Sequence, residues 1–336
     1  MTRLQDLQEQ SVQLLEHCVD GLDDAAHQWT RPEIDALTLA QAARRPLLVR
    51  GEPGTGKTQL ARAAAQHLRW RLLTEVIHAR FEPTDLVYRF DAVRRLADAQ
   101  AGLSLDDKRY WQPGVLWQAY DWAEASRYGD CRHGLHRLAG HVILIDEIDK
   151  ADSDLPNSLL EVLGQRRVRV PGLNLEFGLA KDQAEPLIII TTNEERELPP
   201  AFLRRCVVLN LAPDPEQSYV DWLVSRGHAH FGAIDGHERA TLGEPVLRVA
   251  AEQLEADRHE AKRAGLPPPG PAEYLDLLYA IHKLADGQPE EQMAWLIKLS
   301  AFAYVKNARP EGSTQPSQAR SPVATLKVSA PGQTAA

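Results

Sequence analysis

Short apolar runs alternate with polar, helix-like stretches through the middle of the chain. Each run is apolar at consecutive positions and is bounded by polar or turn-forming residues, the pattern of a strand buried on both faces. Strands that alternate with helices predict a doubly wound α/β domain, in which helices cover both faces of a parallel sheet. The five predicted strands occupy residues 46–50, 71–77, 141–146, 186–192 and 206–211.

The residues before the first predicted strand show a helical periodicity instead. Six apolar residues recur at intervals of three, four or seven positions, which predicts that residues 1–33 are an N-terminal helical segment. A second short helix is predicted from Ile34 to Ala43, and the α/β domain is assigned to residues 34–212. The six apolar residues are Leu4, Leu7, Val12, Leu14, Leu15 and Val19.

No further strand-like run follows Pro213. Helical periodicity predicts a small all-helical second domain over residues 213–308. The last residues, 309–336, have no periodicity and are rich in Pro, Ser, Gln, Thr and Ala, which predicts a disordered tail. The predicted helices of the second domain cover residues 215–227, 242–264, 271–286 and 288–306.

Charge and cysteine content restrict the class of protein. The net charge of the 336 residues is -9, so the surface as a whole repels duplex phosphate, and nucleic acid is disfavoured as a partner. The three cysteines lie far apart in the sequence, which favours a reducing compartment over a disulfide framework. The polar first residues contain no apolar run of membrane-spanning length. We therefore expect a cytoplasmic protein without a membrane segment.

A glycine-rich sequence follows the first predicted strand directly. Residues 51–58, GEPGTGKT, fit the pattern G-x-x-x-x-G-K-[ST] between a strand and a helix, a context that disfavours the alternative of a simple glycine-rich turn. Backbone N–H groups of such a loop form an anion nest, and the helix N-terminus adds its dipole. Lys57 is predicted to contact the β- and γ-phosphates of a nucleotide. The predicted nucleotide-binding residues are Gly51, Pro53, Gly54, Thr55, Gly56, Lys57, Thr58, Gln59 and Asp146.

An acidic pair ends the third predicted strand, HVILIDEID at 141–149. Asp146 is predicted to hold magnesium together with the hydroxyl of Thr58, and Glu147 to polarise the attacking water. An acidic pair after a strand is by itself a common start of a solvated loop. Combined with the glycine-rich sequence, it predicts a P-loop NTPase fold with a nucleoside triphosphate and Mg²⁺ as cofactors.

Two later polar positions extend the predicted site. Asn193 ends the fourth predicted strand, where its amide can hold the attacking water or sense the γ-phosphate; a turn-forming asparagine is the alternative. Arg204 and Arg205 follow a short predicted helix. An arginine beside a neighbouring subunit's γ-phosphate would stabilise charge in the transition state, and a solvated helix end is the alternative.

These motifs, in this order and followed by a helical lid, resemble the AAA+ ATPases over about residues 35–305. Within that superfamily the chain is most similar to the MoxR-like branch, which includes dynein-related and McrB-type modules. Three regions of the sequence carry the similarity. They are FEPTDLVYRFDAVRRL at 81–96 with YWQPGVLWQAYDW at 110–122, LLEVLGQRRVRVPGLNLEF at 159–177, and PAEYLDLLYAI at 271–281.

The resemblance implies a homo-oligomeric ring, usually a hexamer, with ATP at the subunit interfaces. Arg204 or Arg205 would then act on the neighbour's nucleotide, and Arg205 is favoured because it directly precedes Cys206 and the final strand. Relatives are chaperone-like remodellers of client proteins, often paired with a von Willebrand A-domain protein. ATP is favoured over GTP through the resemblance alone.

One departure from the family keeps other functions open. Many relatives carry an arginine at the start of a lid helix, whereas the corresponding GPAEYLD has Ala272 and Glu273. An ATP-gated scaffold with little turnover is therefore one alternative. A nucleic-acid-associated McrB-like motor is another.

Two further clusters are weighed against simpler interpretations. Four residues before and within the third strand are possible zinc ligands, but their spacing matches no standard site and a polar loop is favoured. Three arginines lie on a predicted hairpin ahead of the Asn193 strand, and the solvent face of that hairpin is favoured over contact with a client or nucleic acid. The clusters are Cys131, His133, His136 and His141, and Arg166, Arg167 and Arg169.

Overall fold

The computed structural model describes residues 3–15, 25–129, 139–152, 155–165, 167–179, 184–213, 216–232, 242–285 and 288–304. The chain divides into two compact units, residues 1–214 and residues 215–336. The first unit contains all the strands of the described chain, and the second contains four helices among its described residues.

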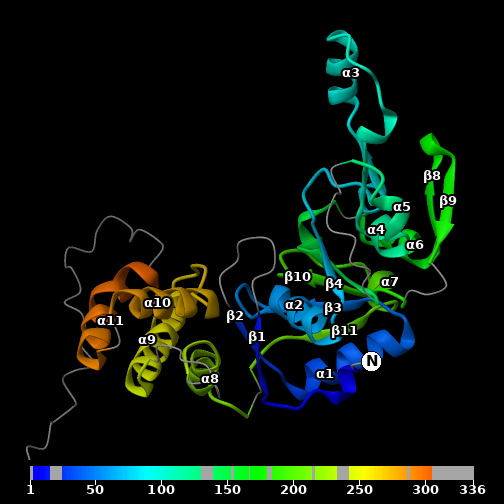
Figure 1. Ribbon diagram of the computed structural model, residues 1–336. Helices are drawn as coiled ribbons and strands as arrows, with labels where there is room; N and C mark the ends of the chain where they lie inside the picture. Colours follow the sequence, from blue (N-terminus) through cyan, green and yellow to red (C-terminus); the bar gives the residue numbers. More distant parts are fainter. Residues whose placement is uncertain are drawn as a thin grey trace, which may run out of the picture. The chain divides into compact units, whose positions relative to one another are not determined.

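A five-stranded parallel sheet forms the centre of the first unit (Figure 1). The predicted α/β class and parallel sheet are therefore confirmed. The strand order is β11-β3-β10-β7-β4, so β3 lies between two strands that come late in the sequence. The loop after β3 consequently meets the carboxyl ends of β10 and β7, where open α/β sheets bind ligands. The strands are β3 (Leu47–Arg50), β4 (Arg71–Val76), β7 (His141–Asp146), β10 (Leu187–Thr192) and β11 (Val207–Asn210).

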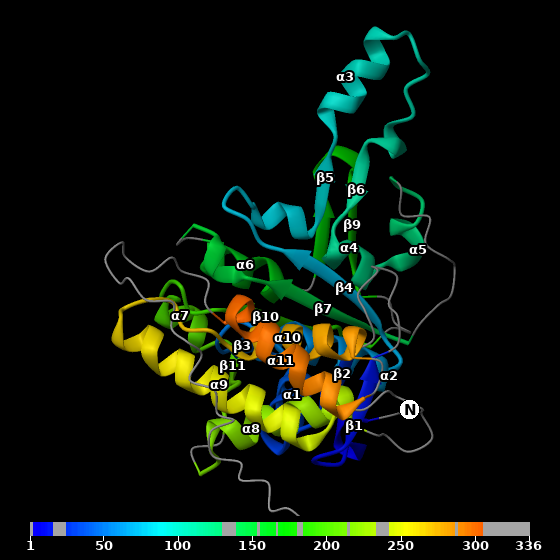
Figure 2. The same cartoon turned by 90° about the vertical axis from the view of Figure 1, so that its left-hand side faces the viewer.

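Consecutive residues of these strands enter two different cores. In β3, Leu47 and Val49 pack beneath α1 (Arg31–Ala43) and α2 (Lys57–Leu68). Leu48 points to the opposite face, which is covered by α4 (Val115–Tyr120), α6 (Leu155–Gln165) and α7 (Pro200–Leu203). Figure 2 shows α1 and α2 on one side of the sheet and α4 and α6 on the other. This two-sided burial is the reason why the strands read as unbroken apolar runs.

The predicted N-terminal helical segment is wrong where the structure describes it. Leu4–Asp6 form a single 3-10 turn, and β1 (Val12–Leu15) pairs antiparallel with β2 (Ala25–Gln28). Side chains of α2 and β1 tie the hairpin down: Gln13 Nε2 donates to Ala63 O at 3.2 Å, and Gln66 Nε2 donates to Leu14 O at 2.7 Å. These long-range contacts outweigh the local helical spacing, and Val19 lies outside the described residues.

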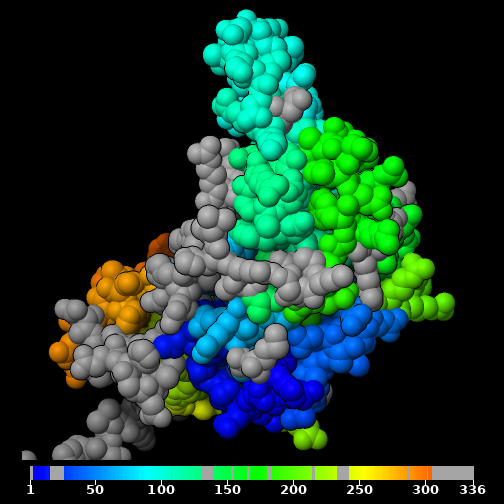
Figure 3. All heavy atoms as spheres, turned by 45° about the vertical axis from the view of Figure 1, so that its right-hand side comes forward, coloured from blue at the N-terminus to red at the C-terminus, as the bar shows by residue number. Residues whose placement is uncertain are grey.

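An arm projects from the first unit between β4 and β7. Strands β5 (Tyr88–Phe90) and β6 (Trp111–Pro113) form an antiparallel ribbon, and α3 (Ala92–Gln100) lies at its outer end. Figures 2 and 3 show this segment standing out from the sheet domain. No residue of α3 is buried. Among the short elements of this region, η2 (Pro83–Leu86) precedes the ribbon, η3 (Asp107–Arg109) lies between α3 and β6, and α5 (Trp122–Ala125) follows α4.

The predicted hairpin before the fourth strand is present. Strands β8 (Arg167–Val170) and β9 (Leu175–Gly178) pair antiparallel around the turn η5 (Pro171–Leu173). Arg167 and Arg169 are exposed while Val168 and Val170 are buried, which fits the solvent-face interpretation. Arg166 lies outside the described residues.

The second unit is helical throughout its described residues, which confirms the predicted helical region. Tyr274 lies at the centre of its core, and the Tyr274 hydroxyl donates to Leu247 O at 3.1 Å. The predicted disordered tail, 309–336, lies outside the described residues. The helices are α8 (Tyr219–Phe231), α9 (Glu244–Arg263), α10 (Pro271–Leu284) and α11 (Pro289–Ala303).

Among the helices of the described chain, none combines the length and the apolar character that crossing a membrane requires.

Candidate nucleotide site

The loop from Gly51 to Gly56 joins the end of β3 to the start of α2. Its backbone requires glycine at two points. A Cβ atom on Gly51 would lie 2.7 Å from Leu211 O, and Gly56 has a φ of 97° directly before the helix. Thr55 closes the loop by donating from Oγ1 to Glu52 O at 2.9 Å. The chain therefore turns sharply at the helix N-terminus, the geometry in which backbone N–H groups converge on an anion.

Lys57, the first residue of α2, is folded back over this loop. Its side chain is 7% exposed, and Nζ donates to Gly51 O at 2.8 Å and to Glu52 O at 2.9 Å. Burial lowers the pKa of Lys57, and nearby carboxylates, Asp146 foremost, oppose that shift. A phosphate would compete with the two carbonyl groups for the ammonium, because a charged acceptor makes the stronger hydrogen bond.

Thr58 and Asp146 come together from α2 and the end of β7. Thr58 Oγ1 donates to Asp146 Oδ2 at 3.1 Å. Two adjacent protein oxygens suit Mg²⁺, which is usually held by one or two side chains plus phosphates and water. The described residues contain no group of three or more His, Cys, Asp or Glu side chains that could hold a metal without such a partner.

Glu147 has an unusual backbone and is held from the neighbouring strand. Its φ is 60°, in the left-handed region that residues other than glycine rarely adopt. The Thr191 hydroxyl, from β10, accepts from Glu147 N at 3.0 Å and donates to Asp146 Oδ1. Asn193 Nδ2 donates to Glu147 Oε1 at 3.5 Å. Asn193 and the acidic pair, predicted from separate strands, are thus brought together.

A second set of hydrogen bonds joins the same two strand ends, this time from a side chain after β7 to the backbone after β10. Asp149 lies in η4 (Ile148–Lys150), which follows the acidic pair, and is 3% exposed. Its Oδ2 atom accepts from Asn193 N and from Glu195 N, both at 3.1 Å. Thr191 therefore fixes the end of β7, and Asp149 fixes the end of β10. We call these two residues the strand brace.

Sequence reasoning missed both residues of the strand brace. The signal was present, because each polar side chain lies within three positions of a predicted site residue. It could not be interpreted without the pairing of β10 with β7, which sets Ile190 opposite Ile145 and so places Thr191 beside the acidic pair.

The remaining predicted residues of the loop differ in their positions. Pro53 and Gly54 are exposed in the turn, and Gly54 has a φ of 79°. Gln59 Oε1 accepts from Arg62 Nη1 at 2.9 Å, so this side chain is bound to its own helix. Among the described residues, the Gln59 side chain forms no hydrogen bond with the other predicted nucleotide-binding residues.

Arg204 and Arg205 do not lie near the glycine-rich loop of their own chain. Both are exposed and follow α7, directly before β11 begins. Arg45 Nη2 donates to Arg204 O at 2.6 Å, which ties this turn to the amino end of β3. The glycine-rich loop lies beyond the carboxyl end of that strand, about 13 Å away along its four residues.

Two other predicted features have simple structural roles. Glu273, in the segment GPAEYLD that has no arginine, caps α10 by accepting from Gly270 N at 2.9 Å. His141 begins β7 and is buried; burial and, second, Arg71 lower the pKa of His141 to about 4. Cys131, His133 and His136, the rest of the possible zinc cluster, lie outside the described residues.

Comparison with solved structures finds similar folds at low identity. A putative ATPase from Cytophaga hutchinsonii is 14% identical, with 81% of this chain and 79% of that chain covered and a TM-score of 0.37. The RuvB Holliday junction branch migration motor of Thermotoga maritima is 14% identical, with 80% and 68% covered and a TM-score of 0.40. A search of the curated proteins gives no significant match.

The family comparison is specific to the sheet domain. The family model that describes the AAA domain of the dynein-related subfamily matches residues 46–206. The matched segment begins directly before β3 and ends directly before β11, so it contains the glycine-rich loop, the acidic pair, Asn193 and both arginines. The sheet domain of this chain, residues 46–206, is therefore similar to the AAA domains of the dynein-related subfamily.

Proposed function

We propose that the protein binds ATP with Mg²⁺ and hydrolyses it at the interfaces of a ring of identical subunits, usually a hexamer in this family. The observation that carries the proposal is the separation of two sets of residues along β3. Lys57, Thr58, Asp146, Glu147 and Asn193 converge at the carboxyl edge of the sheet. Arg204 and Arg205 lie at the amino edge, too far from the glycine-rich loop of their own chain to contact a nucleotide there, which supports action on a neighbouring subunit.

Each residue has a distinct role in the proposed reaction. Lys57 would neutralise the β- and γ-phosphates, while Thr58 and Asp146 would hold the magnesium, which would supply further positive charge when bound. Glu147 orients and polarises the attacking water, and Asn193 fixes the Glu147 carboxylate or the water itself. An arginine from the next subunit, Arg205 in preference to Arg204, stabilises the charge of the transition state.

Hydrolysis would drive chaperone-like remodelling of a client protein in the cytoplasm. This proposal rests on the resemblance to MoxR-like ATPases, as does the expectation of a von Willebrand A-domain partner. The overall charge of -9 supports a protein client over nucleic acid.

A nucleotide-gated scaffold is the second candidate. Its support is Glu273, which caps its own helix where relatives carry an arginine that contacts the γ-phosphate. A lid without that arginine would couple weakly to the nucleotide. The scaffold would assemble on ATP but turn it over slowly.

The first experiment is steady-state ATP hydrolysis over a range of protein concentrations, with light scattering on the same samples. We expect specific activity to rise as the ring forms. The Lys57→Ala variant should be inactive at every concentration. Rings of the wild-type protein without hydrolysis would favour the scaffold over the ATPase.

Mixing two inactive variants tests the interface directly. Arg205→Ala subunits keep all the residues of their own nucleotide site, and Glu147→Gln subunits keep Arg205. A mixture should regain activity, because an Arg205→Ala subunit can receive the arginine of its Glu147→Gln neighbour. Activity that equals the sum of the two separate variants would contradict the proposed action on the neighbour.

A further inference from the structure

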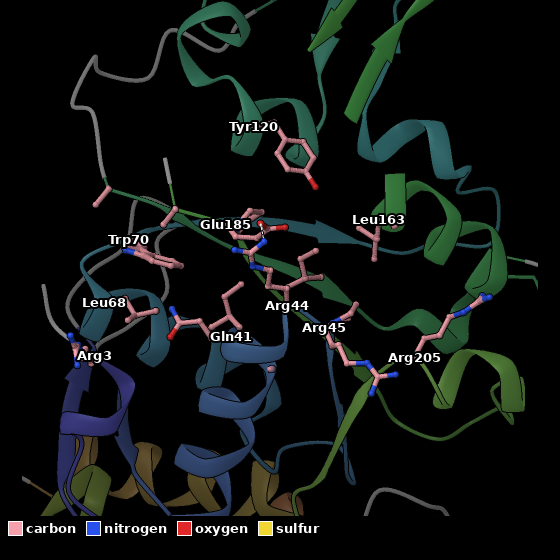
Figure 4. A pocket seen from close by; sticks show the side chains of 18 of the residues that line it. Arg3, Gln41, Arg44, Arg45, Leu68, Trp70, Tyr120, Leu163, Glu185 and Arg205 are labelled. Carbon is pink, nitrogen blue, oxygen red and sulfur yellow. Dashed lines mark ion pairs between the residues drawn. The ribbon is translucent and has the colours of Figure 1, made fainter. Parts of the chain in front are cut away.

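A cavity of about 710 Å³ opens at the amino edge of the sheet, opposite the nucleotide site. Pro46 precedes β3, Trp70 precedes β4 and Leu187 begins β10, so three strand starts form its floor. Figure 4 shows side chains from α1, α2, α6 and the start of β10 around this space. Its volume is in the range of small-molecule pockets, about 300–1,000 Å³.

The rim of the cavity is strongly basic. Among the described residues, five arginines line it against one carboxylate, that of Glu185. Helices α1 and α2 both end here, and their C-terminal dipoles contribute about one negative charge together, which leaves a surplus of about three positive charges. This surplus contrasts with the net charge of -9 of the whole chain. The five are Arg3, Arg44, Arg45, Arg69 and Arg205.

Most of these guanidinium groups have no counter-ion among the residues that the structure describes. Within the described residues, Arg44 is the one of the five that forms an ion pair, at 3.7 Å between Nη1 and Glu185 Oε2. Arg45 is bound to a neutral carbonyl group, Arg204 O. Exposed arginines gathered around a concave surface raise the local concentration of anions.

Two of the arginines occupy backbone positions that favour glycine. Arg44 and Arg69 are the C-caps of α1 and α2, with φ values of 53° and 56°. Such a conformation costs a residue with a side chain about 1 kcal/mol, and a cation at a helix C-terminus regains a similar amount. Helix stability alone therefore gives no reason for arginine in place of glycine at both ends.

The inside of the cavity is apolar. Leu68, Leu160, Leu163 and Leu187 line it and are buried, and the half-buried ring of Trp70 forms part of its wall. An apolar interior binds an aromatic or aliphatic body, while a guanidinium fork on the rim binds a carboxylate, sulfonate or phosphate.

We propose that this cavity binds an amphipathic anion, a small molecule that combines an apolar body with one acidic group. The proposal concerns binding to a single chain and needs neither nucleotide nor a ring. Its failure and the failure of the proposed ATPase function can therefore be told apart.

The test uses anilinonaphthalenesulfonate, an aromatic anion whose fluorescence rises in apolar surroundings. The full-length protein without nucleotide should bind one equivalent per chain in calorimetric and fluorescence titrations. The uncharged analogue N-phenylnaphthylamine should bind about tenfold more weakly, because it lacks the group that the arginines recognise. No binding by the sulfonate, or equal binding of both probes, would overturn the proposal.

The charge requirement is tested by Arg44→Gly combined with Arg69→Gly. Glycine suits both left-handed positions, so the fold should persist, as far-UV circular dichroism can verify. Affinity for the sulfonate should fall about tenfold while affinity for the neutral analogue stays unchanged. The control, Arg80→Ala with Arg169→Ala, removes two exposed arginines outside the cavity and should bind like the wild type. Equal losses in both double variants would overturn the proposal.

Gly164 offers a test of location. It lies on α6 and lines the cavity, and a Cβ atom there would meet no atom within 4 Å. Gly164→Phe should block the sulfonate, with at least a tenfold loss of affinity, whereas Gly164→Ala leaves most of the space open. Unchanged binding by a folded Gly164→Phe variant would show that the probe occupies another place and would overturn the assignment.

Discussion

The two edges of the sheet have opposite chemistry. At the carboxyl edge, Asp146, Glu147, Asp149 and Glu194 surround one buried ammonium group, that of Lys57. At the amino edge, arginines surround a cavity in which Glu185 supplies the one carboxylate among the described lining residues. At the carboxyl edge, side chains of Thr58, Thr191 and Asn193 form hydrogen bonds with the acidic pair, while the arginines at the amino edge are exposed.

The two edges therefore differ in how each would bind a nucleotide or another anion. Under the proposed function, the carboxylates of one edge would hold water and a metal in place, and its lysine and backbone N–H groups would receive phosphate. The arginines of the other edge carry charge without a metal. A chain that keeps these functions at opposite ends of the same strands can present one edge to its own ligand and the other to a second molecule.

The largest expected effect belongs to the carboxyl edge. Glu147→Gln removes the general base but keeps the side-chain shape, so turnover should fall about 1,000-fold while ATP still binds. Single-turnover hydrolysis and nucleotide-binding titrations measure the two effects separately. Sulfonate binding at the amino edge should be unchanged, and normal hydrolysis by this variant would refute the role assigned to Glu147.

The second effect concerns stability at the amino edge, where buried His141 must stay neutral. The pKa of His141 is about 4 when folded and 6.5 when unfolded. The unfolded chain therefore binds more protons between these values, and the free energy of unfolding falls as the pH falls through this window. Between pH 7 and pH 4.5 the loss from this residue is about 2.5 kcal/mol. Urea unfolding of His141→Phe at both pH values should show that much less pH dependence than the wild type.

A smaller effect is expected from the strand brace. Thr191→Val removes the hydroxyl that holds Glu147 N and Asp146, so turnover should fall about tenfold with little change in ATP affinity. Thr38→Val is a suitable control, because its buried hydroxyl has no hydrogen-bond partner among the described residues. If ATP affinity and turnover fell together, the substitution would have disrupted the whole nucleotide site and not only the position of Glu147.

The smallest effect should come from Arg45. Its contact with Arg204 O positions the turn that carries both arginines, so Arg45→Gln should lower ring-dependent turnover about threefold. The wild-type rate at low protein concentration, before the ring forms, is the reference for activity that does not depend on a neighbour. An equal fractional loss below and above the assembly concentration would contradict a role across the interface.

The sequence predicted the parallel sheet because each strand is buried on both faces and each is flanked by a helix. The positions of Lys57, Asp146 and Asn193 followed from where those strands end. Strand order did not follow, and without it the partners of Thr191 and Asp149 could not be found. The N-terminal hairpin was missed because Leu14 and Leu15 fit a helical period as well as a strand, and contacts with α2 decide between the two. The cavity was missed because its arginines are scattered from Arg3 to Arg205 along the chain.

The strand brace has a mechanical consequence. Since Thr191 is bound to the end of β7 and Asp149 to the end of β10, neither strand end can shift alone without breaking hydrogen bonds at the other. The amides of Glu147, Asn193 and Glu195 should therefore exchange with solvent deuterium at one common rate, as a single opening unit. A γ-phosphate that displaces Asn193 would therefore also move the carboxylate of Glu147. Detection of the γ-phosphate and the positioning of Glu147 for hydrolysis would then occur in one step.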